Sequence, residues 1–176
     1  MTLDFTGATA SIIRRYPVTF NETLFNANYD SIARAITHPD PWYISVGLDI
    51  IYGNTGTPFI VAAVNNFFGD TTGAQKCGIS ISNALTGAVE VIDLTLLSRS
   101  EPSLPCFTND IAVNTATGHM FITDFFGYQV FAIKYSLPTD GGITILGSPF
   151  LVSDDMSLLK SSADSLNGPN GCEYLP

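Results

Sequence analysis

The chain has 176 residues, a formal net charge of −9 and only seven lysine and arginine residues. The length fits one domain of ordinary size. So few basic residues cannot follow a phosphate backbone, so we expect no nucleic-acid partner. Charged residues make up 13% of the chain, about half the usual ~25%, which indicates that much of the surface is buried or shared.

Targeting signals and cysteines leave the cellular compartment open. The longest unbroken apolar run, residues 59–64, is far shorter than the ~20 residues of a membrane span, so we expect none. The first residues lack the basic start and apolar core of a signal peptide, but Asn21 opens an N-glycosylation sequon that would matter in a secretory context. The three cysteines lack metal-ligand spacing, and their odd number leaves room for one disulfide but not for a full framework.

The first quarter of the chain predicts one strand and one short helix. Residues 9–19 read as a single strand, and residues 20–44 as a long irregular connection. Within this connection, residues 29–36 are the best helical candidate, because Asn26 and Asn28 could cap them.

The remaining chain predicts an all-β fold. Short β-branched and aromatic runs alternate with clusters of Gly, Asn, Asp, Pro and Thr, a pattern typical of strands joined by turns. The predicted strands fall into two groups of four: residues 46–51, 59–64, 77–82 and 88–94, then residues 109–113, 119–123, 129–135 and 143–151.

The two groups form an internal repeat. In each, a Thr-Gly turn follows the first strand, and the second strand carries a Phe-Ile pair. The aligned starts of the first strands, Val46, Asn109 and Asn170, lie 63 and 61 residues apart. Four strands per unit at such a period are typical of a β-propeller blade, whereas a β-sandwich does not repeat in register.

The repeat predicts a partial β-propeller that forms one incomplete domain over residues 1–176. Residues 1–19 would be the outer end of one blade, residues 45–94 and 108–151 two whole blades, and residues 170–176 the start of the next. Terminal blades without neighbours would leave apolar sheet faces uncovered. We therefore expect a fragment of a longer chain, or a partner that completes the ring.

Asn109 and Asn170 are the candidate site residues that the repeat singles out. The first strand of a blade is innermost, so both side chains should converge on one channel. Amide oxygens suit Ca²⁺, Mg²⁺ or Mn²⁺, and carboxylates would have to complete the shell. Asp110 and Asp124 are candidates for the channel rim, although Asp110 could instead accept hydrogen bonds from nearby backbone. Each asparagine could also simply cap a turn.

Four segments carry a family resemblance: residues 107–113, 117–118, 121–124 and 168–171, which read FTNDIAV, TG, FITD and GPNG. They resemble the regucalcin/gluconolactonase (senescence marker protein) family of six-bladed β-propellers. The resemblance implies one divalent cation (Ca²⁺, Zn²⁺, Mg²⁺ or Mn²⁺) in the channel, held by a Glu, two Asn and an Asp from four blades.

Asn109 and Asn170 match the two asparagines of that family, and Val46 fits the blade that supplies no ligand. The implied Glu would lie before Met1, and the implied Asp, the family's proposed general base, beyond Pro176. The resemblance implies hydrolysis of a lactone or ester, in which the metal polarises the carbonyl and a carboxylate takes a proton from water. The chain alone, with half of the ligands and no base, is expected to be inactive.

Two other interpretations stay open. The chain could belong to a non-catalytic propeller that binds a ligand or partner, similar to the royal jelly/yellow proteins. It could also be an incomplete product without independent function. A Glu at the start of an earlier first strand and an Asp beyond Asn170 would favour the hydrolase, and apolar residues there would favour the scaffold.

Overall fold

Strands make up every regular element in the described part of the chain. The computed structural model, in which only the backbone of the first five strands is described, covers residues 2–4, 12–15, 18–21, 24–27, 34–37, 44–66, 75–97, 105–154 and 172. These ranges contain no helix. Accordingly, no helix long and apolar enough to cross a membrane was found in them. The prediction of an all-β chain is confirmed.

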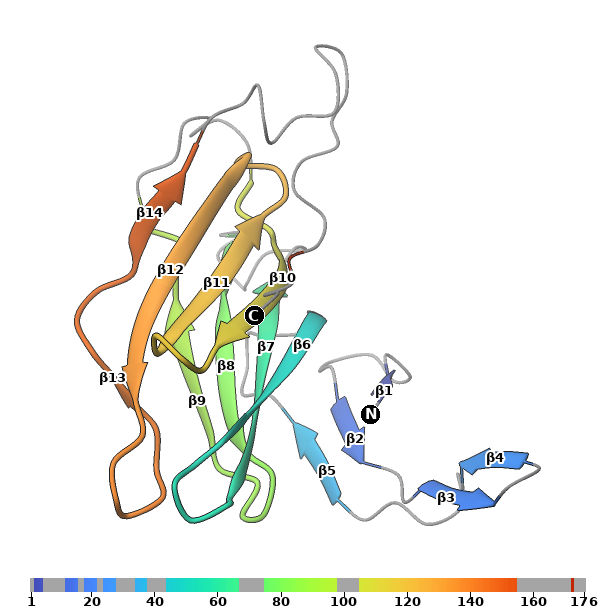
Figure 1. The fold of residues 1–176 in the computed structure, drawn as a ribbon. Coiled ribbons are helices and arrows are strands. Elements are labelled where there is room, and N and C mark those ends of the chain that lie inside the picture. Colours follow the sequence, from blue (N-terminus) through green and yellow to red (C-terminus); the bar gives the residue numbers. More distant parts are fainter. Residues whose placement is uncertain are drawn as a thin grey trace.

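The first large sheet is an antiparallel meander (Figure 1). Its strands, hydrogen-bonded in chain order, are β6 (Ile44–Tyr52), β7 (Pro58–Asn66), β8 (Lys76–Asn83) and β9 (Val89–Asp93). All four predicted strands are present. The second strand extends beyond its predicted end at residue 64, because Asn65 and Asn66 continue the pairing of β7 with β8.

The second large sheet follows the same order. Its strands are β10 (Thr108–Asn114), β11 (His119–Asp124), β12 (Gln129–Ser136), β13 (Thr144–Ile145) and β14 (Phe150–Ser153). Both β13 and β14 pair with β12 on the edge that β11 does not use. The prediction of one strand over residues 143–151 is wrong, because Gly147 between them has a φ of 78°, a left-handed conformation that ends an extended strand.

The turn after the first strand is alike in both sheets. Gly56 follows β6 with a φ of 78°, and Gly118 follows β10 with a φ of 66°. This region of the backbone map favours glycine over residues that carry a Cβ. The repeated Thr-Gly pair of the sequence therefore marks a turn that needs its glycine.

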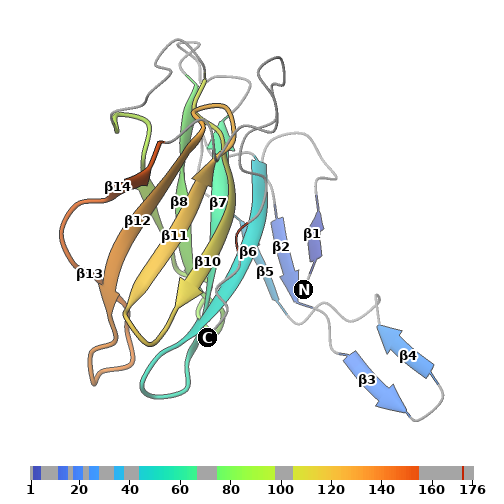
Figure 2. The ribbon, with the colours of Figure 1, turned by 45° about the horizontal axis from the view of Figure 1, so that its top comes forward.

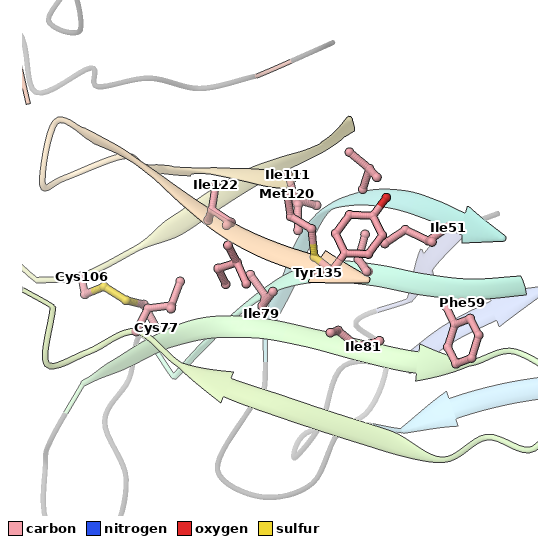
Figure 3. Packing of buried hydrophobic residues seen from close by; sticks show 14 residues of the cluster. Ile51, Phe59, Cys77, Ile79, Ile81, Cys106, Ile111, Met120, Ile122 and Tyr135 are labelled. Carbon is pink, nitrogen blue, oxygen red and sulfur yellow. A yellow bond between two sulfur atoms is a disulfide. The ribbon is translucent and has the colours of Figure 1, made fainter. Parts of the chain in front are cut away.

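The two large sheets share one apolar core (Figure 3). Alternation along each strand turns one face of each sheet toward the other. The aliphatic side chains buried there include Ile51, Val61 and Ile79 from the first sheet and Ile111, Ile122 and Ile133 from the second. Full burial of one such side chain contributes ~1.5–3 kcal/mol to stability.

The first large sheet is also buried on its opposite face. Its central strands, β7 and β8, consist almost entirely of buried residues. Ile60, Ala62 and Val64 form a second apolar cluster on the face away from the second sheet. This sheet is therefore an inner layer of the molecule.

A disulfide between Cys77 and Cys106 links β8 to the segment that leads into β10, with a Cα–Cα distance of 5.5 Å. The third cysteine, Cys172, is free. One bridge and one free thiol agree with the expectation from the cysteine count.

The N-terminal strands form two smaller units beside the large sheets (Figure 2). One is a sheet of β1 (Thr2–Asp4), β2 (Ile12–Arg15) and β5 (Arg34–Thr37), in the order β1-β2-β5. The other is a hairpin of β3 (Val18–Asn21) and β4 (Leu24–Ala27).

Three predictions for this region are wrong. Residues 9–19 are not one strand, since β2 ends at Arg15 and β3 pairs with β4 instead; Pro17, which has no backbone N–H, lies between them in the sequence. Residues 20–44 contain strands. The predicted helix over residues 29–36 is wrong at its C-terminal end, where residues 34–36 belong to β5. Antiparallel pairing with β2 overrides the weak local helical pattern there. Residues 29–33 lie outside the described residues.

Candidate functional site

The first strands of the two large sheets, β6 and β10, lie side by side. Each contains a β-bulge, whose extra residue is Gly47 in β6 and Asn109 in β10. A Cβ atom on Gly47 would lie 2.5 Å from Asp110 Cα and 2.8 Å from Asn109 O. Only glycine lets the two strands approach this closely, so Asn109 sits where they touch.

Two aspartates hold successive repeats together through the same contacts. Asp49 accepts the N–H of the residue after it at 2.7 Å and, through Oδ2, the N–H of Val113 in β10 at 2.8 Å. Asp110 likewise accepts the N–H of the residue after it at 2.9 Å and, through Oδ2, the N–H of Cys172 at 2.9 Å. Hydrogen bonds to a carboxylate are among the stronger ones. The interpretation of Asp110 as a backbone acceptor is confirmed.

Both aspartates line one open pocket of about 430 Å³. The accessible part of its wall is mostly polar. The other residues of the wall come from β6, from β10 and from the expected start of a third repeat: Leu48, Ile111, Ala112, Val113 and Cys172. Three successive repeat starts therefore meet at a single pocket.

The Cys172 thiol is not a nucleophile at neutral pH. Burial, and after it the negative charges of Asp110 and Asp49, raises the pKa of Cys172 to about 12. The thiolate is the reactive form of cysteine, and here it is suppressed. The thiol instead lies 3.6 Å from the carbonyl oxygen of Phe121, to which it donates, as expected for a packed side chain.

Of the two predicted metal ligands, only Asn109 lies in the described part of the chain. Asn109 is half-buried at the bulge of β10 but is not among the residues that line the pocket. Asn170 lies outside the described residues. The convergence of these two side chains on one channel stays a prediction.

The other candidate rim residue, Asp124, is fully buried at the end of β11. Its Oδ1 accepts the N–H of Phe107 at 3.0 Å and the N–H of Gly127 at 3.1 Å. These bonds fix the turn after β11 to the segment that leads into β10. Asp124 does not line the pocket that contains Asp110, and a role at a channel rim stays a prediction.

The described residues alone do not complete the cation shell that the resemblance implies. Among them, no group of three or more His, Cys, Asp or Glu side chains could hold a metal ion. Asp49 and Asp110 each already accept two backbone N–H groups. Asn109 is thus the one predicted ligand whose position is described.

Two polar anchors of the site were not predicted. Asn65, fully buried, acts as a strand partner for Thr108: Nδ2 donates to its carbonyl at 2.7 Å, and Oδ1 accepts its N–H at 2.9 Å. Asp49 could have been found as the charged residue of an apolar strand, since a half-buried charge is stabilised by hydrogen-bond partners. Asn65 gave no local signal, because its partner lies 43 residues away.

Comparisons of this chain with protein-family models, with curated proteins and with solved structures find no match. Function is therefore inferred from the residues of the chain and their geometry.

Proposed function

We propose that the two large sheets are consecutive blades of a six-bladed β-propeller, whose channel hosts a divalent-metal-dependent lactone or ester hydrolase. One observation carries the functional part of this proposal. The starts of three successive repeats, in β6, in β10 and at Cys172, meet at one polar pocket. In a propeller the first strands surround the central channel, where the resemblance places the catalytic cation.

Two features support blades over a β-sandwich. The outer faces of a sandwich carry polar residues, whereas the first sheet is buried on both faces. Cys172 also lies against the face of the second sheet that points away from the first, through its contacts with Phe121 and Asp110. Both features favour a stack of more than two layers, as in blades around an axis.

Four residues have a stated role in this proposal. Asn109 supplies an amide oxygen, and Asn170, two residues before Cys172, supplies the second. Asp49 and Asp110 fix the spacing of the first strands, and their charges favour a cation in the pocket. The cation, when bound, would polarise the carbonyl of the substrate.

Calorimetric titration of the chain with Ca²⁺, Mn²⁺ and Zn²⁺ tests the proposal. We expect weak binding that Asn109→Ala reduces by roughly tenfold or more, since even an outer-sphere partner is worth that much. Asn83→Ala is the matched control, because Asn83 only caps the turn after β8. Equal affinity in both variants would remove Asn109 from the site.

Turnover is a separate test. We expect no lactone hydrolysis by the 176-residue chain, because no residue of this sequence matches the implied Glu or the general-base Asp. Hydrolysis that is abolished by Asn109→Asp or Asn170→Ala would contradict this expectation.

The second candidate function is a non-catalytic scaffold of the royal jelly/yellow type. Asp49 and Asp110 both accept backbone N–H groups of a neighbouring repeat. Pocket carboxylates that hold repeats together favour a scaffold over a catalytic site. A ligand that binds the folded state raises its unfolding midpoint. Midpoints unchanged by each cation would favour the scaffold.

A further inference from the structure

One sequence motif plays no part in the pocket. Asn21 is the only asparagine of the chain that is followed by a non-proline residue and then by Ser or Thr. It is the last residue of β3 and pairs with Leu24, the first residue of β4. The sequon Asn21-Glu22-Thr23 therefore spans the connection of a β-hairpin, a position where chain modifications are commonly tolerated.

The register of the hairpin places Asn21 on its polar side. Residues paired across two antiparallel strands share a face, and neighbours along a strand alternate. One face carries the apolar set Val18, Phe20, Phe25 and Ala27, and the other carries Thr19, Asn21, Leu24 and Asn26. By register, the acceptor residue therefore belongs to the more polar of the two sets.

The hairpin also lies apart from the two large sheets in both views (Figures 1 and 2). The shared core and the pocket are built by strands β6 to β13, the segments between them and Cys172. A bulky addition at Asn21 therefore does not compete with either of them.

The disulfide is an independent indication of the compartment. Cys77 and Cys106 are both almost fully buried, and their bond joins the two large sheets. Structural disulfides form and persist in oxidising compartments and are rare where cells keep thiols reduced. The two cysteines lose two protons and two electrons to a disulfide of an exchange catalyst, which becomes a dithiol.

We propose that Asn21 is an N-glycosylation site and that the chain matures in an oxidising secretory compartment. A bond forms between Asn21 Nδ2 and the anomeric carbon of a lipid-linked oligosaccharide. The bond between that carbon and the pyrophosphate oxygen breaks, the lipid pyrophosphate leaves with the electron pair, and the amide proton passes to the transferase. This proposal does not depend on the hydrolase function.

Peptide mapping of the protein purified from the cells that make it tests both parts. After treatment with a peptide N-glycosidase in heavy-oxygen water, we expect Asn21 to be converted to a labelled aspartate. Before reduction, the Cys77 and Cys106 peptides should be linked. An unmodified Asn21 would overturn the glycosylation site, and free Cys77 and Cys106 thiols would overturn the compartment.

Expression of the chain behind a secretion signal in eukaryotic cells is a second test of glycosylation at Asn21. Total protein, from both cells and medium, should show one glycosidase-sensitive form. Thr23→Ser should keep that form and Thr23→Val should lose it, because the acceptor motif needs a hydroxyl residue. A wild-type chain without glycan, or a glycan that persists in Thr23→Val, would refute Asn21 as the acceptor.

Discussion

The disulfide offers the sharpest test of how the two large sheets are held together. It lies at one end of their shared core, as Figure 3 shows, and ties the beginning of β8 to the segment before β10. The double substitution C77A/C106A removes this cross-link. It leaves two small apolar side chains in place of two sulfur atoms, so the core loses little volume.

The magnitude follows from the length of the closed loop. For a sequence separation of 29 residues, the lost entropy of the unfolded chain corresponds to about 3.5 kcal/mol at 25 °C. In a chain of this size, that change lowers the thermal midpoint by roughly 7–14 °C. The hydrogen bonds between Asn65 and Thr108 hold the same segment without the disulfide, so the variant should still fold.

Urea unfolding followed by far-ultraviolet circular dichroism measures this loss. The oxidised wild type is compared with the reduced wild type and with C77A/C106A in both conditions. Reductant should shift the wild type to the midpoint of the variant and leave the variant unchanged. Cys172→Ala, which removes the half-buried free thiol, should cost less than about 1 kcal/mol.

Equal midpoints for all of these samples would refute the reasoning. Such a result would mean that the unfolded chain gains no freedom when the cross-link is lost, or that the bond does not form in solution. Non-reducing peptide mapping separates these two cases, because it shows directly whether the two cysteines are joined.

Three other predictions concern Gly47 in β6, Tyr135 in β12 and Cys172. Gly47→Ala should lower the free energy of unfolding by about 2 kcal/mol or more in urea titrations, because its Cβ would meet the backbone of β10. Tyr135→Phe should raise it by about 1 kcal/mol in the same assay, because its buried hydroxyl has no hydrogen-bond partner in the described part of the chain. The wild type should lose stability as pH rises from about 9 toward 12, because the unfolded chain releases the Cys172 proton near 9.0 and the folded chain holds it to about 12; thermal midpoints across this range should fall less in Cys172→Ala.

Each of these outcomes has a control. Tyr52→Phe changes an exposed ring and should be neutral, so a loss of stability in Tyr135→Phe alone would show that its hydroxyl is bonded. A wild-type stability for Gly47→Ala would mean that β6 and β10 can separate at no cost. Tyr135 adds to the alkaline loss above pH 10, because burial and then the charge of Asp49 raise its pKa; equal slopes for wild type and Cys172→Ala would contradict the role of the thiol.

Most strands of the large sheets were predictable because their signals are local. The apolar run of residues 59–64 defines β7, and the turn glycines Gly56 and Gly118 mark the hairpins β6–β7 and β10–β11. The N-terminal strands were not predictable in the same way. β5 is a strand because β2 lies beside it, and the paired residues are 19 to 25 positions apart in the sequence. The break at Gly147 was missed because one glycine in an apolar run also fits a continuous strand.

The site was predictable only where one residue type stood out. Asp110 was correctly interpreted as a possible acceptor for nearby backbone, because it accepts the N–H of Ile111, but its second partner, Cys172, is 62 residues away. The alignment of first strands also missed the β-bulges. The extra residue in β6 is Gly47, so Gly47 and not Val46 corresponds to Asn109. A bulge adds one residue to a strand and shifts all that follow. Neither Gly47 nor Val46 has a donor atom in its side chain, so the expectation that this repeat supplies no ligand is unchanged.

The same shift decides which residue of the third repeat matches Asn109. Cys172 and Val113 make equivalent contacts, since each donates its N–H to an aspartate of the preceding repeat. On this basis Asn109, four residues before Val113, corresponds to Gly168, whereas the sequence alignment pairs it with Asn170. If the contact sets the alignment and the third repeat forms a strand here, two residues amount to about 7 Å along its axis, too far for Asn109 and Asn170 to share one cation. Metal titration of Asn109→Ala and Asn170→Ala therefore distinguishes the two alignments: a loss of affinity in both variants supports the sequence alignment, and a loss in Asn109→Ala alone supports the contact.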